Sequence, residues 1–415
     1  MRIEAIRVSN FKTFAGLDLS LNAFDVLIGE NGAGKSNFID IIQFIRDIGV
    51  EGLENAVSLQ GDVEFVKNIC EDTAAPFSLE VTVSQSRPIV LSFCEDRSRR
   101  IEAAVERCIY RIALDIGQDT FSILEESLDA RCRYTAVGED GSPEPIDTGA
   151  ITLTREKDGS CTLEITPPEM MARIVWMPAV PQQVPPRASL LEEPYANPLA
   201  APLVHHLCQF FSKIAVYDFD PRLSKKVSPW AGRARLETDA SNLPIVLRHI
   251  LRDPVRKEQL QWMVSENLPF IEDLRMERLS GSSLTTTLKE TYCSRRFTPA
   301  SLLSDGTISL IALIVALYFE ERSVIVLEEP LRNIHPHHAS KIIAMMKDAS
   351  EQQGRQLLIT THSPEIVKYA GIERILLLQR DERGNSSIMR PREKEELKVF
   401  LENMGIEELY VQNLL

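Results

Sequence analysis

One eight-residue stretch constrains this chain more than any other, because Gly29-Glu30-Asn31-Gly32-Ala33-Gly34-Lys35-Ser36 fits the pattern G-x-x-x-x-G-K-S without a mismatch. The short apolar run Asp25 to Ile28 before it predicts a buried parallel strand. The apolar face of Phe38 to Ile45 after it predicts a helix. In this context the loop backbone and the positive helix end cradle phosphate. The flanking elements disfavour the alternative, a chance glycine-rich turn.

The loop predicts roles for its residues in binding ATP and Mg²⁺. Lys35 is expected to reach the β- and γ-phosphates and Ser36 to ligate the magnesium ion. The predicted nucleotide-binding residues of this loop are Asn31, Gly32, Ala33, Gly34, Lys35, Ser36 and Asn37. A loop of this kind by itself leaves kinases, GTPases, helicases and transporter motors open as classes.

Two carboxylates and a histidine follow further predicted strands. Ser323 to Leu327 predicts a buried strand, and Glu328 and Glu329 come at its carboxyl end, where open α/β sheets bind ligands. We expect Glu328 to hold magnesium and Glu329 to orient or deprotonate the attacking water. The predicted strand Gln356 to Thr360 brings His362 to the same edge, where it can sense the γ-phosphate. Taken alone, a histidine such as His362 would more often be an ordinary surface-loop residue, and its place after a strand within Thr-Thr-His-Ser-Pro favours the functional role.

Ser304 stands where a helix N-cap belongs, before the apolar helix predicted for Ile308 to Phe319. A helix N-terminus with a serine hydroxyl and Gly306 beside it is an anion site. The chain already has a phosphate loop, so this second site predicts a γ-phosphate held by a second copy of the chain. The alternative is an ordinary capped helix.

These motifs resemble the ABC-type ATPase heads of the SMC, RecF and OLD-like group, and look closest to its stand-alone "AAA family ATPases". The opening Met1 to Phe14 is similar to the first strand and Asn-Phe-Lys turn of that group. Leu303 to Thr307 is similar to the signature motif, Glu328-Glu329-Pro330 to Walker B, and Arg332 to Pro336 to the D-loop. The resemblance implies that Ser304 completes the ATP site of a partner subunit, that His362 is the switch histidine, and that Lys35, Glu329 and His362 serve catalysis. It also implies a Q-loop glutamine at the magnesium, for which Gln60 is the candidate.

Two positions depart from the family pattern. The Walker B aspartate is Glu328, whose longer side chain implies less direct contact with magnesium. The signature reads Ser-Asp-Gly-Thr where transporters carry Ser-Gly-Gly-Gln, which argues against a transporter motor and suggests slow hydrolysis.

The expected fold is α/β: a P-loop NTPase head of ABC type with an antiparallel β lobe and a helical insertion. Residues 1–202 are predicted to form the N-terminal ATPase lobe, 203–297 the helical insertion, and 298–415 the C-terminal ATPase lobe. Strand patterns at 77–83, 108–114, 131–137, 150–154 and 160–165 predict the β lobe. Helical patterns at 203–214, 243–251 and 254–264 predict the insertion, which has no sustained heptads and so no long coiled coil.

Composition adds expectations about location and partners. The longest apolar run is too short to cross a bilayer and the chain does not open like a secretory signal, so no membrane association is expected. Seven scattered cysteines without a C-x-x-C pair suggest free thiols in the cytoplasm. The net charge of −14 argues mildly against constitutive DNA binding. A local group is the exception: Arg222, Lys225, Lys226, Arg233 and Arg235 flank Trp230 and form either a nucleic-acid clasp or a solvated loop.

The leading interpretation is a Mg²⁺-dependent ATPase that forms a head-to-head homodimer around two ATP molecules. Its action is expected on DNA, in maintenance or repair, or on a partner effector protein. The alternative is a purely regulatory ATPase subunit of a phage-defence or toxin-type complex that does not itself bind DNA. The sequence after His362 has no Asp-x-Asp pair, so nuclease activity in this chain is not expected.

Overall fold

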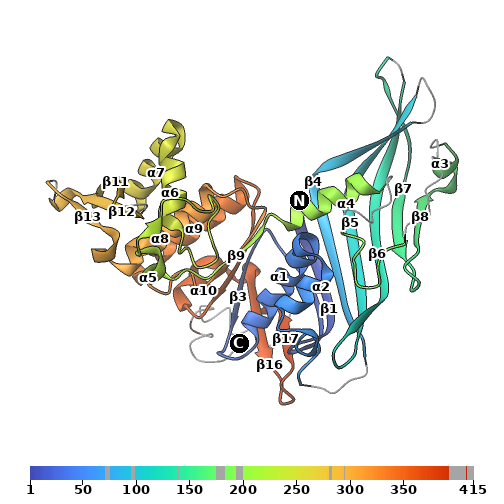
Figure 1. Cartoon of the computed structure of the whole chain (residues 1–415), viewed down its shortest axis with the longest axis horizontal. Coiled ribbons are helices and arrows are strands. Elements are labelled where there is room, and N and C mark those ends of the chain that lie inside the picture. Colours follow the sequence, from blue (N-terminus) through green and yellow to red (C-terminus); the bar gives the residue numbers. More distant parts are fainter. Residues whose placement is uncertain are drawn as a thin grey trace. The chain divides into compact units, whose positions relative to one another are not determined.

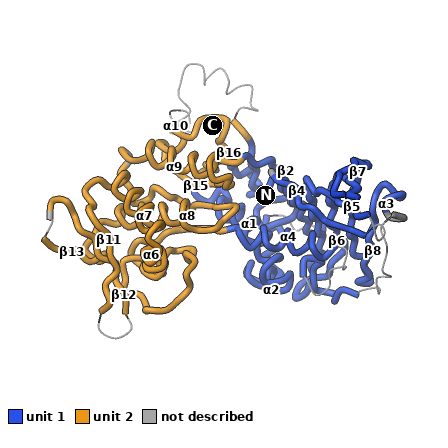
Figure 2. The backbone as a smooth tube through the Cα atoms, turned by 90° about the horizontal axis from the view of Figure 1, so that it is seen from above, with its two compact units in different colours: residues 1–22, 31–214, 378–389 blue, residues 23–30, 215–377, 390–415 orange. Residues whose placement is uncertain are grey.

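The computed structural model describes residues 1–70, 75–94, 99–138, 140–173, 183–192, 200–279, 283–293, 295–391 and 408. They form two compact units, coloured separately in Figure 2. The first unit comprises residues 1–22, 31–214 and 378–389, and the second comprises 23–30, 215–377 and 390–415. These bounds differ from the division into lobes that the sequence predicted at residues 202 and 297, because the order of motifs along a chain does not reveal which segments pack together. The division into two ATPase lobes and an insertion remains a prediction.

The first unit is built on a seven-stranded antiparallel sheet with the order β2-β1-β4-β5-β6-β7-β8 (Figure 1). Its strands are β1 Arg2–Phe11, β2 Phe14–Ser20, β4 Phe77–Cys94, β5 Arg100–Ile116, β6 Phe121–Val137, β7 Pro143–Arg155 and β8 Cys161–Thr166. Side chains alternate between buried and exposed along β5, as expected for a sheet with one face packed on a core. The predicted β lobe is confirmed, and β4, β5, β6 and β7 are longer than the sequence patterns indicated.

Helix α1 (Lys35–Glu51) belongs to this unit, with buried Phe38, Phe44 and several isoleucines on its apolar side. The rings of Phe11, Phe44 and Phe77 lie 5.5 to 6.2 Å apart, which joins the helix to strands β1 and β4. The remaining elements of the unit are α2 Leu53–Leu59, η1 Val63–Phe65, α3 Pro168–Arg173 and α4 Ala201–Phe211.

The second unit contains a largely buried sheet with the strand order β16-β3-β15-β14-β9, and β16 continues into the first unit, where it pairs with β17. The strands are β3 Phe24–Gly29, β9 Ile214–Tyr217, β14 Val324–Glu328, β15 Gln356–Thr361, β16 Ile375–Arg380 and β17 Ser386–Met389. Strand β15 pairs in parallel with both β14 and β3. The predicted strands before the loop, before Glu328 and before His362 are therefore confirmed.

The helices of the second unit include α8 (Asp305–Tyr318), whose residues from Thr307 to Leu317 are all buried. The other helices are α5 Pro221–Ser224, α6 Leu243–Arg252, α7 Pro254–Asn267, α9 Ala339–Glu351 and α10 Pro364–Ala370, and the short 3₁₀ turns are η3 Thr291–Cys293, η4 Ala300–Leu302, η5 Pro336–His338 and η6 Ile372–Arg374. None of the helices within the described residues is long and apolar enough to span a membrane.

The predicted helical insertion holds more than helices. Its helices are confirmed as α4 in the first unit and as α6 and α7 in the second. The second unit also has a small sheet of β10 (Ser228–Pro229), β11 (Ile271–Arg278), β12 (Ser283–Glu290) and β13 (Phe297–Pro299). Strand β12 buries Thr285, Thr286 and Thr287. These three threonines stand consecutively between the buried Leu284 and Leu288, so the strand lacks the regular alternation of apolar and polar residues by which a sequence search finds strands.

A buried carboxylate secures a separate segment of the first unit to its sheet. Glu126 on β6 accepts hydrogen bonds at Oε1 from the hydroxyls of Tyr110 (2.7 Å) and Ser189 (2.5 Å) and from the backbone N–H of Leu190 (3.0 Å). Burial raises the pKa of Glu126 to about 7, although these hydrogen bonds and the charge of Arg155 oppose the shift. Near neutral pH the fold therefore holds this carboxyl partly protonated.

We expect Glu126→Gln to remove a pH dependence of stability. A carboxyl whose pKa is raised in the folded state stabilises the fold below its unfolded pKa, and that contribution is lost as pH rises through about 7. Measured by thermal unfolding from pH 5 to 8, the wild type should lose up to roughly 3 kcal/mol relative to the variant. Glu125→Gln, at the exposed neighbouring position, should follow the wild type. Equal pH dependence in all three proteins would contradict this assignment.

Candidate functional site

The phosphate loop follows the buried strand β3 and opens helix α1. Gly34 is the N-cap of the helix, with φ 114°, and Gly32 also has a positive φ of 80°. Among the described residues no side chain caps this helix end, and its first turn carries no acidic residue. The first turn of the helix thus brings no negative charge of its own to the positive helix end. This geometry fits a bound phosphate group.

The predicted loop residues differ in exposure. Asn31, Gly32 and Ser36 are exposed, Lys35 is half-buried, and Ala33 and Gly34 are buried. The side-chain amide of Asn37 donates to Thr13 Oγ1 at 2.9 Å, so this residue also fastens the start of α1 to the turn after β1. Gln60 lies at the C-cap of α2 with its side chain buried, and its Oε1 has no hydrogen-bond partner among the described residues. Its role at magnesium remains a prediction.

Three parallel strands bring the start of the loop and the acidic residues to one sheet edge. Ile28 of β3 stands opposite Thr361 of β15, and Thr360 stands opposite Glu328 of β14. The loop begins at Gly29, directly after Ile28, and Glu329 and His362 directly follow the other two strands. Carboxyl ends of parallel strands are where open α/β sheets bind ligands. The register therefore joins segments that are about 300 residues apart in the sequence.

Glu329 has a strained and well-held conformation. Its φ is 44°, in the left-handed region that costs free energy for a residue with a Cβ. Its N–H donates to the Thr360 carbonyl at 2.9 Å, and its Oε2 accepts from Thr361 Oγ1 at 3.3 Å. Its Oε1 is buried and has no hydrogen-bond partner within the described part of the chain, although His362 Nε2 lies 3.6 Å away. A buried carboxylate oxygen with unused acceptor capacity is suited to accept a proton from water.

The two residues predicted as magnesium ligands are compatible with that ion. Ser36 supplies a hydroxyl in the first turn of α1, and Glu328 supplies a half-buried carboxylate at the end of β14. Magnesium prefers oxygen ligands and takes only one or two from the protein at nucleotide sites, with phosphate oxygens and water completing its shell. The donor chemistry of this pair thus fits Mg²⁺.

Ser304 is an N-cap, as the sequence predicted. Its Oγ accepts from the Thr307 N–H at 3.1 Å and lies 2.7 Å from the Thr307 hydroxyl, and the residue is exposed at the start of α8. Gly306 packs against the segment after Walker B, because a Cβ there would lie only 2.6 Å from the Asn333 carbonyl oxygen. Any larger residue at position 306 would push apart the signature turn, as we call residues 303–307, and the D-loop segment, residues 332–336.

Lys225 braces this signature turn, a role that sequence reasoning missed. Its Nζ donates to the Leu303 carbonyl at 2.5 Å and to the Asp305 carboxylate, and the side chain is largely buried. On the same segment, Asp218 lies 3.7 Å from Arg332 of the D-loop. The sequence grouped Lys225 with basic residues near Trp230 and gave no signal of a contact 80 residues away. Its placement instead makes it an internal support, so it is not a free member of a nucleic-acid clasp.

The ring of Trp230 is also already in contact with side chains of the same unit. The guanidinium groups of Arg248 and Arg278 lie 4.6 and 4.8 Å from its ring centroid. Of the basic group predicted around it, Arg222, Lys226, Arg233 and Arg235 are exposed.

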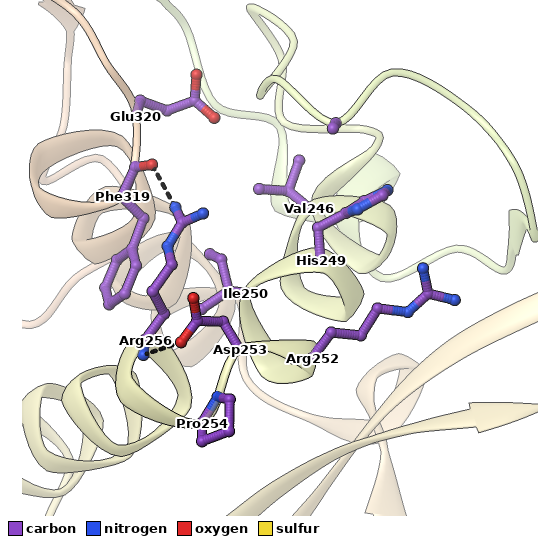
Figure 3. Close-up of a pocket in the computed structure, with 10 residues that line it drawn as sticks. Val246, His249, Ile250, Arg252, Asp253, Pro254, Arg256, Phe319 and Glu320 are labelled. Carbon is purple, nitrogen blue, oxygen red and sulfur yellow. Dashed lines mark hydrogen bonds between the residues drawn. The ribbon is translucent and has the colours of Figure 1, made fainter.

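A separate pocket of about 600 Å³ lies in the second unit among α6, α7 and the end of α8 (Figure 3). Arg256 donates to the Phe319 carbonyl at 2.8 Å, and Asp253 caps α7 by accepting from the Val255 and Arg256 N–H groups. Burial and the nearby charges of Arg248 and Arg252 lower the pKa of His249. The wall of the pocket carries two arginines and two carboxylates, so their charges nearly cancel. None of the predicted site residues lines the pocket.

We expect Lys225→Ala to loosen the first turn of α8. Hydrogen bonds from a charged donor contribute roughly 1.5–3 kcal/mol, and here their loss would leave a carbonyl and a carboxylate unpaired. Amide hydrogen exchange over residues 303–308 should accelerate about tenfold or more. Lys226→Ala removes the same charge from the exposed neighbouring residue and should leave that exchange unchanged. Equal effects of the two variants would show that Lys225 is not a brace.

A family model described as "AAA domain, putative AbiEii toxin, Type IV TA system" matches residues 25–103 and 217–368, more than half of the chain. The matched segments contain the phosphate loop, both carboxylates and His362. No curated protein matches the chain significantly.

Solved structures of SMC heads also match. An SMC head bound to the C-winged helix domain of ScpA is 13% identical, with a TM-score of 0.50 over 94% of this chain and 98% of that chain. The SMC head domain from Thermotoga maritima is 14% identical (TM-score 0.44, 94% and 99% covered). An SMC head with an extended coiled coil bound to the C-terminal domain of ScpA, derived from Pyrococcus furiosus, is 12% identical (0.43, 96% and 98%).

The first of these likenesses, at low identity, speaks for the fold alone. It agrees with the presence of a parallel sheet with a phosphate loop at its carboxyl edge and of an antiparallel sheet in the same chain. The chain belongs to the AAA-domain family that its sequence matches, and its fold is that of an ABC-type, SMC-like P-loop ATPase head.

Proposed function

We propose that this chain binds and hydrolyses Mg²⁺–ATP and that two copies clamp the nucleotide between them. The observation that carries the hydrolytic part is the sheet edge where the phosphate loop starts beside Glu328, Glu329 and His362. A phosphate cradle, a magnesium-type carboxylate and a second carboxylate with an unused oxygen are the groups that phosphoryl transfer to water requires. A cytoplasmic location, where ATP and magnesium are abundant, is part of the proposal.

Each residue has a distinct role in this proposal. The loop from Asn31 to Asn37 surrounds the phosphates, with Lys35 neutralising charge on the β- and γ-phosphates. Ser36, Glu328 and Gln60 would hold a magnesium ion, which would supply positive charge to the phosphate oxygens. Glu329 accepts the proton of the attacking water, and His362, 3.6 Å from it, donates to the γ-phosphate.

The proposed dimer depends on the signature turn, which contains Ser304. Ser304 presents a hydroxyl and a helix N-terminus at the surface of the second unit, which supports its use by a phosphate from another molecule. Gly306 packs tightly on Asn333, and Lys225 and Asp218 connect the same region to the D-loop. Through these contacts the state of Glu329 would influence how Ser304 is presented to a partner, so that hydrolysis separates the two copies.

Glu329→Gln should trap the ATP-bound dimer. The amide keeps the shape of the side chain but cannot accept a proton from water, so turnover should fall at least about 100-fold while ATP binding persists. Light scattering after size exclusion should show monomers without nucleotide and dimers with Mg²⁺–ATP. A variant that binds ATP and stays monomeric at all concentrations would contradict the clamp.

Ser304→Arg tests the contribution of the partner copy. An arginine at the helix tip should block approach of a second copy, so ATP turnover and the Glu329→Gln dimer should both be lost while binding of ATP to the monomer is retained. Ser340→Arg places the same bulk on an exposed serine of α9 and serves as the matched control. Unchanged turnover in Ser304→Arg would refute the shared site.

We further propose that the cycle controls a partner effector protein, with direct action on DNA as the second candidate. The family description names a putative toxin of a Type IV TA system, which favours action together with a second protein. The net charge of −14 and the internal use of Lys225 and Trp230 weaken the DNA clasp that the sequence suggested. Exposed Arg233 and Arg235 are what still favours DNA.

ATP turnover with and without duplex DNA separates these two outputs. Under the partner proposal, duplex DNA leaves turnover unchanged at 50 and 200 mM salt, and co-expression with the product of a neighbouring gene changes it. If DNA stimulates turnover, salt suppresses the stimulation, and Arg233→Ala with Arg235→Ala abolishes it, DNA is the substrate and the partner proposal is wrong.

A further inference from the structure

We infer that the hairpin formed by β16 and β17 holds the backbone of the phosphate loop in place through hydrogen bonds. In this role Arg380 and Ser386 are positioning residues for nucleotide binding. The inference rests on the proposed function, since it concerns how the loop is held for ATP. All of the contacts that carry it lie inside the first unit, which contains residues 31–214 and 378–389.

Two backbone carbonyls of the loop are hydrogen-bonded by this hairpin. The Arg380 Nη1 group donates to the Gly32 carbonyl at 3.1 Å, and the Ser386 hydroxyl donates to the Ala33 carbonyl at 2.6 Å. Arg380 is itself oriented, because its Nε donates to the Gly384 carbonyl in the same hairpin at 2.6 Å. The loop is therefore bound at two consecutive residues by side chains about 350 positions further along the chain.

Peptide geometry turns these two bonds into an orientation of the loop. In a planar trans peptide the C=O and the following N–H point in opposite directions. Bonding the Gly32 carbonyl to Arg380 therefore directs the Ala33 N–H away from the hairpin, and bonding the Ala33 carbonyl to Ser386 does the same for the Gly34 N–H. Inward N–H groups of this kind form the anion concavity of a phosphate loop.

The approach of the hairpin also explains why position 34 must be glycine. A Cβ on Gly34 would lie 2.4 Å from Ser386 Oγ and 2.9 Å from Thr13 Oγ1, and its φ of 114° is strained for any other residue. Ser386 is buried, its Oγ also lies within hydrogen-bond distance of Thr13 Oγ1, at 2.8 Å, and its backbone N–H donates to the Thr13 carbonyl at 2.7 Å. The glycine, the threonine and the serine thus form one close-packed contact.

The hairpin is rigid enough to act as a support. Asp381 Oδ1 accepts from the N–H groups of Arg383 and Asn385, which closes the turn. The Asn385 side chain accepts from Asn68 Nδ2 at 3.1 Å, and the Cys70 thiol donates to the Gly384 carbonyl at 3.0 Å. Hydrogen bonds on both sides of the turn limit its movement, so the positions of Arg380 and Ser386 are set before nucleotide arrives.

The test compares Arg380→Ala and Ser386→Ala with Arg383→Ala in the full-length chain. Arg383→Ala removes the same charge from the same turn, and Arg383 is exposed and, within the part of the chain that the structure describes, is hydrogen-bonded through its backbone N–H to Asp381 alone. Titration with a fluorescent ATP analogue and Mg²⁺ should show Kd raised roughly three- to tenfold by the first two variants, the size expected for one lost hydrogen bond, and unchanged by the control.

A second readout separates positioning from a purely structural role. Hydrogen exchange of the peptide covering residues 29–36 should accelerate in Arg380→Ala and Ser386→Ala without nucleotide, while the melting temperature changes by no more than about 4 °C. Arg380→Lys retains one donor and should recover part of the affinity. Lower melting temperatures with unchanged Kd would overturn the inference and leave a structural role.

The outcome for the wild type keeps the two hypotheses apart. If neither the wild type nor Arg383→Ala binds Mg²⁺–ATP, the proposed function fails, and so does the inference that depends on it. If both bind and Arg380→Ala and Ser386→Ala bind equally well, the proposed function stands and only the role of the hairpin is refuted.

Discussion

The parallel register of β3, β15 and β14 is the constraint on which the rest of this structure depends. Hydrogen bonding aligns Ile28 with Thr361 and Glu328 with Thr360, so three strands end at the same edge. A shift by one residue would turn every side chain on a strand to the opposite face. All residues of β3 and β15 are buried, so a shifted strand would have to repack both of its faces against closely packed neighbours. Hydrophobic burial thereby positions Glu329 and His362, although neither residue is apolar.

The carboxyl edge of the parallel sheet brings together polar groups whose conformations cost free energy, and hydrogen bonds from neighbouring residues offset part of that free energy. Glu329 keeps a left-handed φ because its N–H is bonded to Thr360 and its carboxylate to Thr361. Strain of this kind persists only where neighbouring contacts over-determine the conformation. The signature turn follows the same logic, since Lys225 neutralises Asp305 and bonds the Leu303 carbonyl next to Ser304. In both places an exposed or reactive group is supported by less exposed groups behind it.

Most of the elements around the site could be read from patterns in the sequence. The strands before the loop, before Glu328 and before His362 are continuous apolar runs, and Ser304 precedes an apolar helix in the manner of an N-cap. The pairing of β11 with β12 escaped this approach because three consecutive threonines stand between the buried Leu284 and Leu288 of β12 and interrupt the apolar pattern. Periodicity detects apolar burial, and it does not detect polar residues that are buried with their hydrogen bonds satisfied.

The sequence by itself determined the local chemistry: a glycine loop that exposes N–H groups, a serine at a helix tip, and two adjacent carboxylates after a strand. These depend on neighbouring residues, whose conformational preferences act within a few positions. Only the tertiary structure decided which distant side chains support them: Lys225 at Asp305, Arg380 at Gly32 and Ser386 at Ala33. The physical reason is that a hydrogen bond requires proximity in space, and lysine, arginine and serine occur so often on surfaces that their types alone do not reveal a partner 80 or 350 residues away.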